Sequence, residues 1–336
     1  MRRVARRGRV VQLEHASRAL AGNRLGDPSI RQVPVYLPPG YDDSDARYPV
    51  LFCLAGFTGT GESHLAWKAW DESLPQRLDR LQAEGRMGPA IVVLPDCFTR
   101  LGGSQYINSS VCGRYSDYLV EELVPLVDER FRTLGGREHR GILGKSSGGF
   151  GAMVQAMMHP EVWGGAACHS GDAFFEFCFL PELPRACNTL SRAGGVRSFL
   201  DSFARKRKRS QAEIHTIMML AMAACFDPQP GKGEGFELPC DLHTGRMNPE
   251  RWERWLAWDP VRMIPDHVPA LRSQRVLFID CGDRDQYNLH FGARQMREQL
   301  SRAGVPVVYE EFSDNHSAVG YRMDVSLPLL VRVLST

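Results

Sequence analysis

The stretch GILGKSSGGFGA, residues 141–152, decides the fold more than any other part of the sequence. A short apolar run, Gly141–Leu143, leads into a G-x-S-x-G motif centred on Ser146, and small residues typical of a helix start follow. A motif of this kind between a strand and a helix is the pattern of a nucleophile elbow, in which a tight turn exposes a serine at the carboxyl edge of a sheet. The stretch therefore predicts Ser146 as a nucleophile within an α/β sheet.

The same stretch contains Gly-Lys-Ser, which also ends a phosphate-binding P-loop. That motif requires a glycine five positions before Gly144, and His139 stands there instead. The helix after Ser146 would direct its positive N-terminal end at the serine, which favours negative charge developing during a reaction. The nucleophile interpretation is therefore preferred to nucleotide binding.

Short apolar runs with little alternation occur on both sides of the motif. They are Arg31–Leu37, Pro49–Ala55, Ala90–Leu94, Gly165–Cys168, Val276–Cys281 and Val307–Phe312. Such runs are typical of strands buried on both faces of a parallel sheet. Helical stripes lie between them at 119–127, with a kink or restart expected at Pro125, and at 289–300, with an end expected at Gly304. The alternation predicts an α/β fold with a mostly parallel, doubly wound sheet.

The stretch 172–266 breaks this rhythm because it contains no clear strand. It holds a basic run, Arg205–Arg209, an apolar Met-rich run, Ile217–Phe226, and three tryptophans at positions 252, 255 and 258. We interpret it as a largely helical cap insertion, with the hydrolase core formed by residues 1–171 and 267–336. The basic run is expected to be a solvated helix face, and the tryptophans are expected to pack inside the cap.

A serine nucleophile needs a base, and the base needs an orienting acid. In the order Ser, Asp/Glu, His of an α/β-hydrolase, Asp285 follows the strand at 276–281 and His316 follows the strand at 307–312. Both loops lie where strands end at the carboxyl edge. Asp280, Asp283 and Asp172 are rival acids, and His169, which precedes Asp172, is expected to pack or hydrogen-bond locally.

An oxyanion hole should be formed by two backbone amides. One is that of Ser147, directly after the nucleophile, and the other should come from the loop 55–59, where Gly56 would allow the Phe57 amide to face the site. The loop 102–106 would face the same edge, so that Gln105 and Tyr106 are candidates for lining a substrate pocket, although Tyr106 is equally compatible with a buried structural role.

Composition narrows the class of protein further. The chain has 336 residues, a near-balanced net charge of +2, and nine cysteines without a CxxC pair. Such a charge gives no field for nucleic acid, and the longest apolar run is too short for a membrane span. A basic N-terminus without an apolar run is not a secretory signal, and scattered cysteines favour a reducing cytoplasm. A homodimer through a sheet edge or the cap is compatible with the sequence.

These features together resemble the putative esterase family of α/β-hydrolases, the group of esterase D and S-formylglutathione hydrolases, enterochelin esterases and mycolyltransferases. The resemblance rests on VYLPPGYD (35–42), YPVLFCLAGFTG (48–59), IVVLPD (91–96), GKSSGGFGAM (144–153), IDCGDRDQY (279–287) and DNHS (314–317). It implies the same nucleophile, acid and base as the residues do: Ser146, Asp285 and His316. The family's common G-H-S is Gly144-Lys145-Ser146 here, a departure that weakens the case for a glutathione thioester substrate.

The expected activity is hydrolysis of small-molecule carboxylic esters through an acyl-enzyme, with no metal or organic cofactor. An acyltransferase or a thioester hydrolase would use the same site. A non-catalytic binding protein of the same fold is the alternative from another class, and a peptidase acting on small amides is a further one. The Met-rich run and the tryptophans suggest acyl or aryl groups of modest size.

Overall fold

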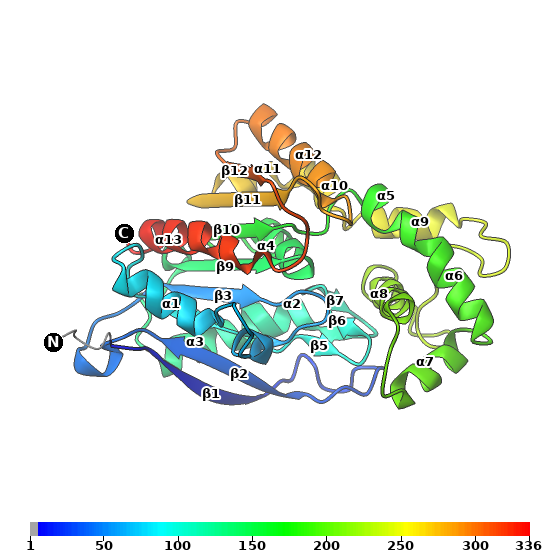
Figure 1. The fold of residues 1–336 in the computed structure, drawn as a ribbon, viewed down its shortest axis with the longest axis horizontal. Helices are drawn as coiled ribbons and strands as arrows, with labels where there is room; N and C mark the ends of the chain where they lie inside the picture. Colours follow the sequence, from blue (N-terminus) through cyan, green and yellow to red (C-terminus); the bar gives the residue numbers. More distant parts are fainter. Residues whose placement is uncertain (1–5) are drawn as a thin grey trace.

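The computed structural model describes residues 6–336, and its centre is an eight-stranded sheet (Figure 1). The strand order is β1-β2-β4-β3-β9-β10-β11-β12. From β4 to β12 all neighbours are parallel, whereas β2 runs antiparallel to both β1 and β4. The sheet strands are β1 Arg9–Ala16, β2 Ile30–Leu37, β3 Val50–Leu54, β4 Ile91–Val93, β9 Arg140–Lys145, β10 Gly165–His169, β11 Val276–Gly282 and β12 Val308–Phe312.

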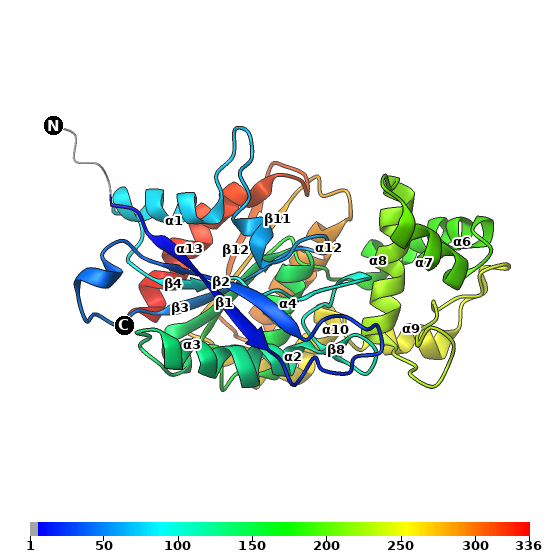
Figure 2. The same ribbon diagram turned by 90° about the horizontal axis from the view of Figure 1, so that it is seen from below.

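Helices cover both faces of this sheet. They are α1 Leu74–Ala83, α2 Tyr115–Asp117, α3 Val124–Arg130, α4 Ser147–Met158, α11 Val268–Arg272, α12 Leu289–Arg302 and α13 Met323–Leu334. Two small hairpins, β5–β6 (Phe98–Thr99 and Gly102–Gly103) and β7–β8 (Asn108–Ser109 and Gly113–Arg114), follow β4. Figure 2 shows α1 and α13 on one side of the sheet and α2 and α3 on the other. This is the layered arrangement that the sequence predicts, and the α/β-hydrolase fold class is confirmed.

The core has two layers because the strands are buried on both faces. In β3, Phe52 and Leu54 pack with the larger cluster on the α4 side, whereas Leu51 and Cys53 pack with the cluster under α1 and α13. All five β3 residues are buried. Alternation of side chains along a strand explains why this apolar run shows no alternation in polarity.

The 172–266 segment is helical in the described structure. It contains α5 Phe175–Cys178, α6 Leu183–Arg192, α7 Val196–Arg205, α8 Gln211–Phe226, α9 Pro249–Leu256 and α10 Pro260–Met263. Helices α6 to α9 gather beside the sheet, at the right of Figures 1 and 2. The Ser109 Oγ donates to the Ala224 carbonyl of α8 at 2.6 Å, so that α8 is anchored to the β7–β8 hairpin.

Several local expectations can be compared with the structure. Helix α12 ends before Gly304, which adopts φ +64. Before Pro125 the chain forms a π-helical turn, Tyr118–Leu123, and after it the helix restarts as α3. The proline lies in the first turn of α3, where its lack of an N–H costs no hydrogen bond within the helix. The run Arg205–Arg209 is exposed, but the expectation of a helix face was wrong: only Arg205 belongs to α7, and residues 206–209 form the connection to α8. In this connection Lys206 pairs with Glu213, and Arg209 makes a cation–π contact with Phe203. Trp255 is fully buried.

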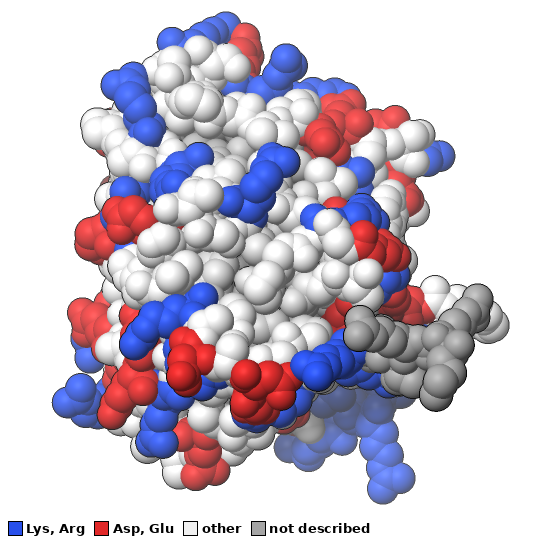
Figure 3. All heavy atoms as spheres, turned by 90° about the vertical axis from the view of Figure 1, so that its left-hand side faces the viewer, with Lys and Arg blue, Asp and Glu red and all other residues white. Residues whose placement is uncertain are grey.

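Charge is distributed without a dominant sign on the face at the left of Figure 1. Figure 3 shows basic and acidic side chains interspersed over this face. The mixture on this face agrees with the net charge of +2. No helix within residues 6–336 is both long enough and apolar enough to cross a membrane.

The N-terminus of α8 is closed by a capping box that depends on a charge. The Ser210 Oγ accepts from the Glu213 amide at 3.3 Å, and the Glu213 carboxylate accepts from the Ser210 amide at 2.9 Å and from Lys206. The hydrogen bond from Lys206 and those from Ser210 lower the pKa of Glu213 from 4.5 to about 2. Since the unfolded carboxylate binds protons more readily, ionised Glu213 stabilises the fold above pH 4.5, and this contribution disappears as the pH falls through about 2.

Glu213→Gln is therefore expected to lower the free energy of unfolding at pH 7, and its difference from wild type should shrink as the pH falls from 4.5 toward 2. Urea unfolding at a series of pH values measures this difference. Glu129→Gln is the control, because exposed Glu129 has no ion pair within residues 6–336. A Glu213→Gln deficit of the same size at both ends of the pH range would contradict the prediction.

Candidate active site

The turn between β9 and α4 holds Ser146 in a backbone conformation that residues other than glycine rarely adopt. Its backbone has φ 58 and ψ −127. A Cβ on Gly148 would lie 2.3 Å from the Leu54 carbonyl oxygen, and a Cβ on Gly144 would lie 2.5 Å from the Gly148 carbonyl carbon. Only glycine allows β3, β9 and α4 to approach this closely, so the two glycines make the strained turn attainable. Ser146 consequently sits at the N-terminus of α4, as the motif predicts.

Asp285 and His316 lie in neighbouring loops after β11 and β12. The Asp285 Oδ2 and the His316 Nδ1 are 2.7 Å apart, and their side chains are 0% and 10% exposed. The other Asp285 oxygen accepts from the Tyr287 amide at 2.9 Å. The His316 amide donates to the Gln286 Oε1 at 3.0 Å, and the Tyr287 ring packs edge-on against the imidazole. The 285–287 loop thus fixes both the acid and the orientation of the histidine ring.

One cavity of about 510 Å³ brings the candidate residues together. Ser146, Ser147, His316 and Phe57 all line it, whereas Asp285 lies behind His316. Another part of the wall comes from the 172–266 segment. It is formed by Asp172, Cys178, Phe179, Ile214, His215 and Met218. The arrangement offers an accessible hydroxyl and an accessible imidazole in one partly apolar cavity, which is the setting for nucleophilic catalysis.

The loop 55–59 lies directly beside the candidate nucleophile. A Cβ on Gly56 would be 3.7 Å from the Ser146 Cβ. The Gly103 amide donates to the Phe57 carbonyl at 2.8 Å, which fixes the Phe57 backbone from the β6 side. Within residues 6–336, the amides of Phe57 and Ser147 donate no hydrogen bond. Two unused amides near Ser146 are available for an oxyanion.

Gln105 and Tyr106 stand behind this loop rather than in the cavity wall. Both are buried, and both have positive φ, at 55 and 58. The Tyr106 hydroxyl donates to the Ala55 carbonyl at 2.5 Å, so Tyr106 supports the start of the 55–59 loop. The Gln105 amide donates to Asp172 Oδ2 at 3.1 Å and reaches the cavity only through that carboxylate. The structure therefore gives Tyr106 the structural role that the sequence left open.

Asp172 is a cavity residue, but it does not contact His316. Its Oδ2 accepts from the Ser147 Oγ at 3.1 Å and from Gln105. Burial raises the pKa of Asp172, and these hydrogen bonds together with His316 act in the opposite direction. Its position beside Ser147 makes it a support for the first turn of α4, whereas the partner of His316 is Asp285.

A second Ser-His-Asp set is completely buried elsewhere in the core. The His169 Nδ1 lies 2.7 Å from Asp280 Oδ1, and its Nε2 lies 2.7 Å from the Ser326 Oγ. The Arg322 guanidinium donates to the other Asp280 oxygen at 2.9 Å. The side chains of His169, Asp280 and Ser326 are at most 2% exposed. This network joins β10, β11 and α13 and cannot meet a substrate, so that the rival acid Asp280 has a structural role together with His169.

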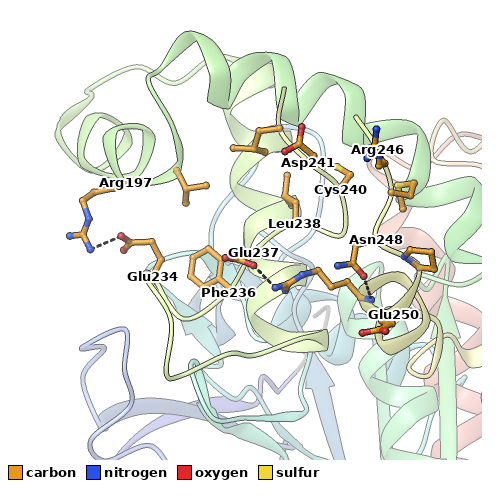
Figure 4. Close-up of a pocket in the computed structure, with 15 residues that line it drawn as sticks. Arg197, Glu234, Phe236, Glu237, Leu238, Cys240, Asp241, Arg246, Asn248 and Glu250 are labelled. Atoms are coloured by element: carbon orange, nitrogen blue, oxygen red, sulfur yellow. Dashed lines mark hydrogen bonds and ion pairs between the residues drawn. The ribbon is translucent and has the colours of Figure 1, made fainter. Parts of the chain in front are cut away.

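A cavity larger than the one at Ser146 lies inside the 172–266 segment. It measures about 1000 Å³ and contains none of the candidate catalytic residues (Figure 4). Two pairs of its charged side chains form ion pairs: Arg251 with Glu237, and Arg197 with Glu234 at 2.7 Å. The Asn248 side chain caps α9 by accepting from the Arg251 amide. Size alone therefore does not identify the site, because the lining of this cavity contains neither a serine nor a histidine.

The sequence did not point to several residues of the smaller cavity. Tyr287 and His215 connect its two walls, with the Tyr287 hydroxyl 3.5 Å from the His215 Nε2. Lys68 and His64 come from the loop after β3. The signals for Tyr287 were its place two residues after Asp285 and at the end of the motif IDCGDRDQY (279–287). Nothing in the sequence pattern places α8 opposite this loop.

Ser326→Ala is expected to destabilise the fold by about 1–3 kcal/mol, because it leaves a buried histidine nitrogen without its partner. Urea unfolding measures the change. Ser301→Ala, in an exposed position of α12, is the control and should stay within about 0.5 kcal/mol of wild type. Equal stability of the two variants would show that the buried network contributes nothing.

Comparison with known proteins agrees with this fold and motif. The model of the family described as "Putative esterase" matches residues 26–326. Part of the chain is 29% identical over 144 residues to an endo-1,4-beta-xylanase/feruloyl esterase of Xylanibacter ruminicola, covering 42% of this chain and 19% of that protein. An esterase of Mycobacterium tuberculosis is 30% identical over 142 residues, covering 42% and 29%. The chain thus spans less than a third of the length of these two relatives.

Solved structures match over nearly the whole chain. A ferulic acid esterase superposes with a TM-score of 0.61 at 20% identity, covering 98% of this chain and 99% of that chain. An S-formylglutathione hydrolase from Agrobacterium tumefaciens gives 0.59 at 17%, covering 97% and 96%. At sequence identities of 17% and 20%, the structural similarity establishes a shared fold alone.

The sheet order and the serine elbow define an α/β-hydrolase fold. Within that class, the chain belongs to the putative esterase family, whose model covers most of its length.

Proposed function

We propose that this protein is a serine hydrolase that cleaves carboxylic esters through an acyl-enzyme. The observation that carries the proposal is that Ser146, on its strained turn, shares one cavity with His316, whose other ring nitrogen is 2.7 Å from buried Asp285. Membership of an esterase family supports the same reaction class. The proposed acid, base and nucleophile are those that the sequence motifs indicate.

In the proposed mechanism, the His316 Nε2 removes the proton from the Ser146 hydroxyl as its oxygen attacks the ester carbonyl. Asp285 accepts from Nδ1–H, which holds the tautomer that leaves Nε2 free to accept, and it stabilises the imidazolium that forms. The amides of Phe57 and Ser147 bind the oxyanion, and each is expected to contribute about 3 kcal/mol in the transition state. His316 then protonates the departing alcohol and activates water against the acyl-enzyme.

The part of the cavity wall that comes from the 172–266 segment supports a substrate with an apolar portion. Ile214, Met218 and Phe179 line it, and α8 supplies the first two. We therefore propose that the 172–266 segment acts as a cap over the site, and that it favours acyl or aryl groups of modest size. All nine cysteines are free and buried, which supports the proposed cytoplasmic setting.

Ser146→Ala is expected to abolish hydrolysis of p-nitrophenyl acetate and labelling by a fluorophosphonate probe, because it removes the hydroxyl that is proposed to attack both reagents. Absorbance at the p-nitrophenolate band and peptide mass mapping measure the two effects. Ser326→Ala is the matched control, since it removes a serine that contacts a histidine outside the cavity. If Ser146→Ala kept its turnover, the nucleophile would be wrong; if folded wild type took no label, the binding-protein alternative would gain support.

Asp285→Asn is expected to lower kcat by roughly 10³–10⁴-fold, because an amide at this position favours the wrong imidazole tautomer. Asp172→Asn is the isosteric comparison and should cost far less, since Asp172 contacts Ser147 and not His316. Steady-state kinetics on p-nitrophenyl acetate distinguish the two. A larger loss for Asp172→Asn would assign the orienting acid to Asp172.

A further inference from the structure

Two lysines line the cavity that holds Ser146, and the proposed mechanism uses neither. Lys145 is the last residue of β9, directly before the serine, and Lys68 lies in the loop after the short helix Gly61–His64. Among the residues that the structure describes, Lys206 pairs with Glu213, but neither Lys68 nor Lys145 has an ion pair. Two lysines, exposed Lys68 and half-buried Lys145, thus line one cavity, and neither forms an ion pair within residues 6–336.

The negative charges near this cavity are already engaged. Asp172 is the one carboxylate among its described lining residues, and it accepts hydrogen bonds from Ser147 and Gln105. Asp285 lies behind His316 and is bonded to it. The cationic groups are therefore available to a substrate rather than committed to a partner within the protein.

The environment of Lys145 shows that its charge lacks solvation. Burial lowers its pKa, and the charge of Lys68 lowers it further, whereas Asp285 acts in the opposite direction. An ammonium that is half-buried beside a second one gains most from a bound anion, because the anion relieves both the desolvation and the repulsion. The N-terminus of α4 at Ser147 adds a partial positive charge on the same side.

We propose that Lys145 and Lys68 bind an anionic group of the substrate, so that the enzyme prefers esters that carry a carboxylate or similar anion near the scissile bond. The inference rests on the proposed function and names the substrate class of that site. The apolar portion of such an ester would lie against Ile214 and Met218 on α8. Lys145 is then a specificity-determining residue at the variable position of the G-x-S-x-G motif.

Two pairs of esters test the preference and show which side of the ester carries the anion. On the acyl side, monomethyl succinate is compared with methyl succinamate, its neutral amide counterpart. On the alcohol side, 4-acetoxybenzoate is compared with 4-acetoxybenzamide. Product release measured by chromatography gives kcat/KM for each ester, and p-nitrophenyl acetate reports on the proposed function itself. We expect wild type to favour the anionic member of one pair by roughly 10- to 100-fold, less at 0.5 M salt.

Lys145→Met and Lys68→Met should each lower the ratio of anionic to neutral kcat/KM by about tenfold or more, and Lys145→Arg should restore most of it. Lys208→Met, at an exposed position beyond the C-terminus of α7, is the matched control and should leave the ratio unchanged. The rate of labelling by a neutral fluorophosphonate checks that Ser146 remains reactive in each variant.

The outcomes separate the two proposals. If wild type hydrolyses p-nitrophenyl acetate but shows a ratio near one in both pairs, esterase function stands and anion selection is wrong. If Lys145→Met lowers both members of a pair equally, the lysine acts on the catalytic groups, through its charge near Asp285, and not on the substrate. If no ester is hydrolysed and no label is taken, the proposed function itself fails.

Discussion

The close approach of β3, β9 and α4 is the constraint on which the rest of the site depends. At Gly148 no side chain could fit, because a Cβ would meet the carbonyl oxygen of Leu54 at 2.3 Å. The contact forces the chain to turn at Ser146 with positive φ and to begin a helix at once. It also brings the end of β3 against the turn, so that the 55–59 loop lies beside Ser146. The strain at one residue is thereby sustained by packing along two strands and a helix.

The two Ser-His-Asp sets show why residue type alone does not define a catalytic site. His169, Asp280 and Ser326 have contact distances as short as those of a catalytic triad, yet they are sealed in the core and are further tied by Arg322. His316 lines a cavity, and only its Nδ1 contacts a carboxylate. A general base needs one nitrogen free toward the substrate, and burial removes that freedom from His169.

The cavity is shared between the sheet edge and the 172–266 segment, and this division explains its mixed character. The sheet side supplies polar and reactive groups, including Lys145 beside Ser146. Helix α8 supplies Ile214 and Met218, together with His215, which is held by Glu182 at 2.9 Å and reaches Tyr287. The buried apolar residues of α8 pack in the core, and the N-terminal end of the helix lines the cavity. Under the proposed function, the sheet edge carries out ester cleavage, and the 172–266 segment contributes the apolar contacts that select the substrate.

Local pattern was sufficient for the strands, the serine turn and the loops that carry Asp285 and His316. Each of these follows from short-range rules: apolar runs give buried strands, glycines permit a tight turn, and parallel strands end at the same edge. The antiparallel edge strand β1 was less evident, because its residues Arg9–Ala16 are mostly exposed or half-buried and carry little apolar signal.

The tertiary structure decided what depends on residues distant in the chain. It distinguished Asp285 from the other candidate acids, Asp280 and Asp172, because only the Asp285 carboxylate contacts His316. Of the two roles that the sequence left open for Tyr106, it favours support of the 55–59 loop, since the Tyr106 hydroxyl donates to a carbonyl 51 residues away. It also placed Lys68 and Lys145 in one cavity. The sequence by itself determined the fold and the chemical groups, because these rest on local geometry; the surroundings of each group were decided only by long-range packing, which no local pattern encodes.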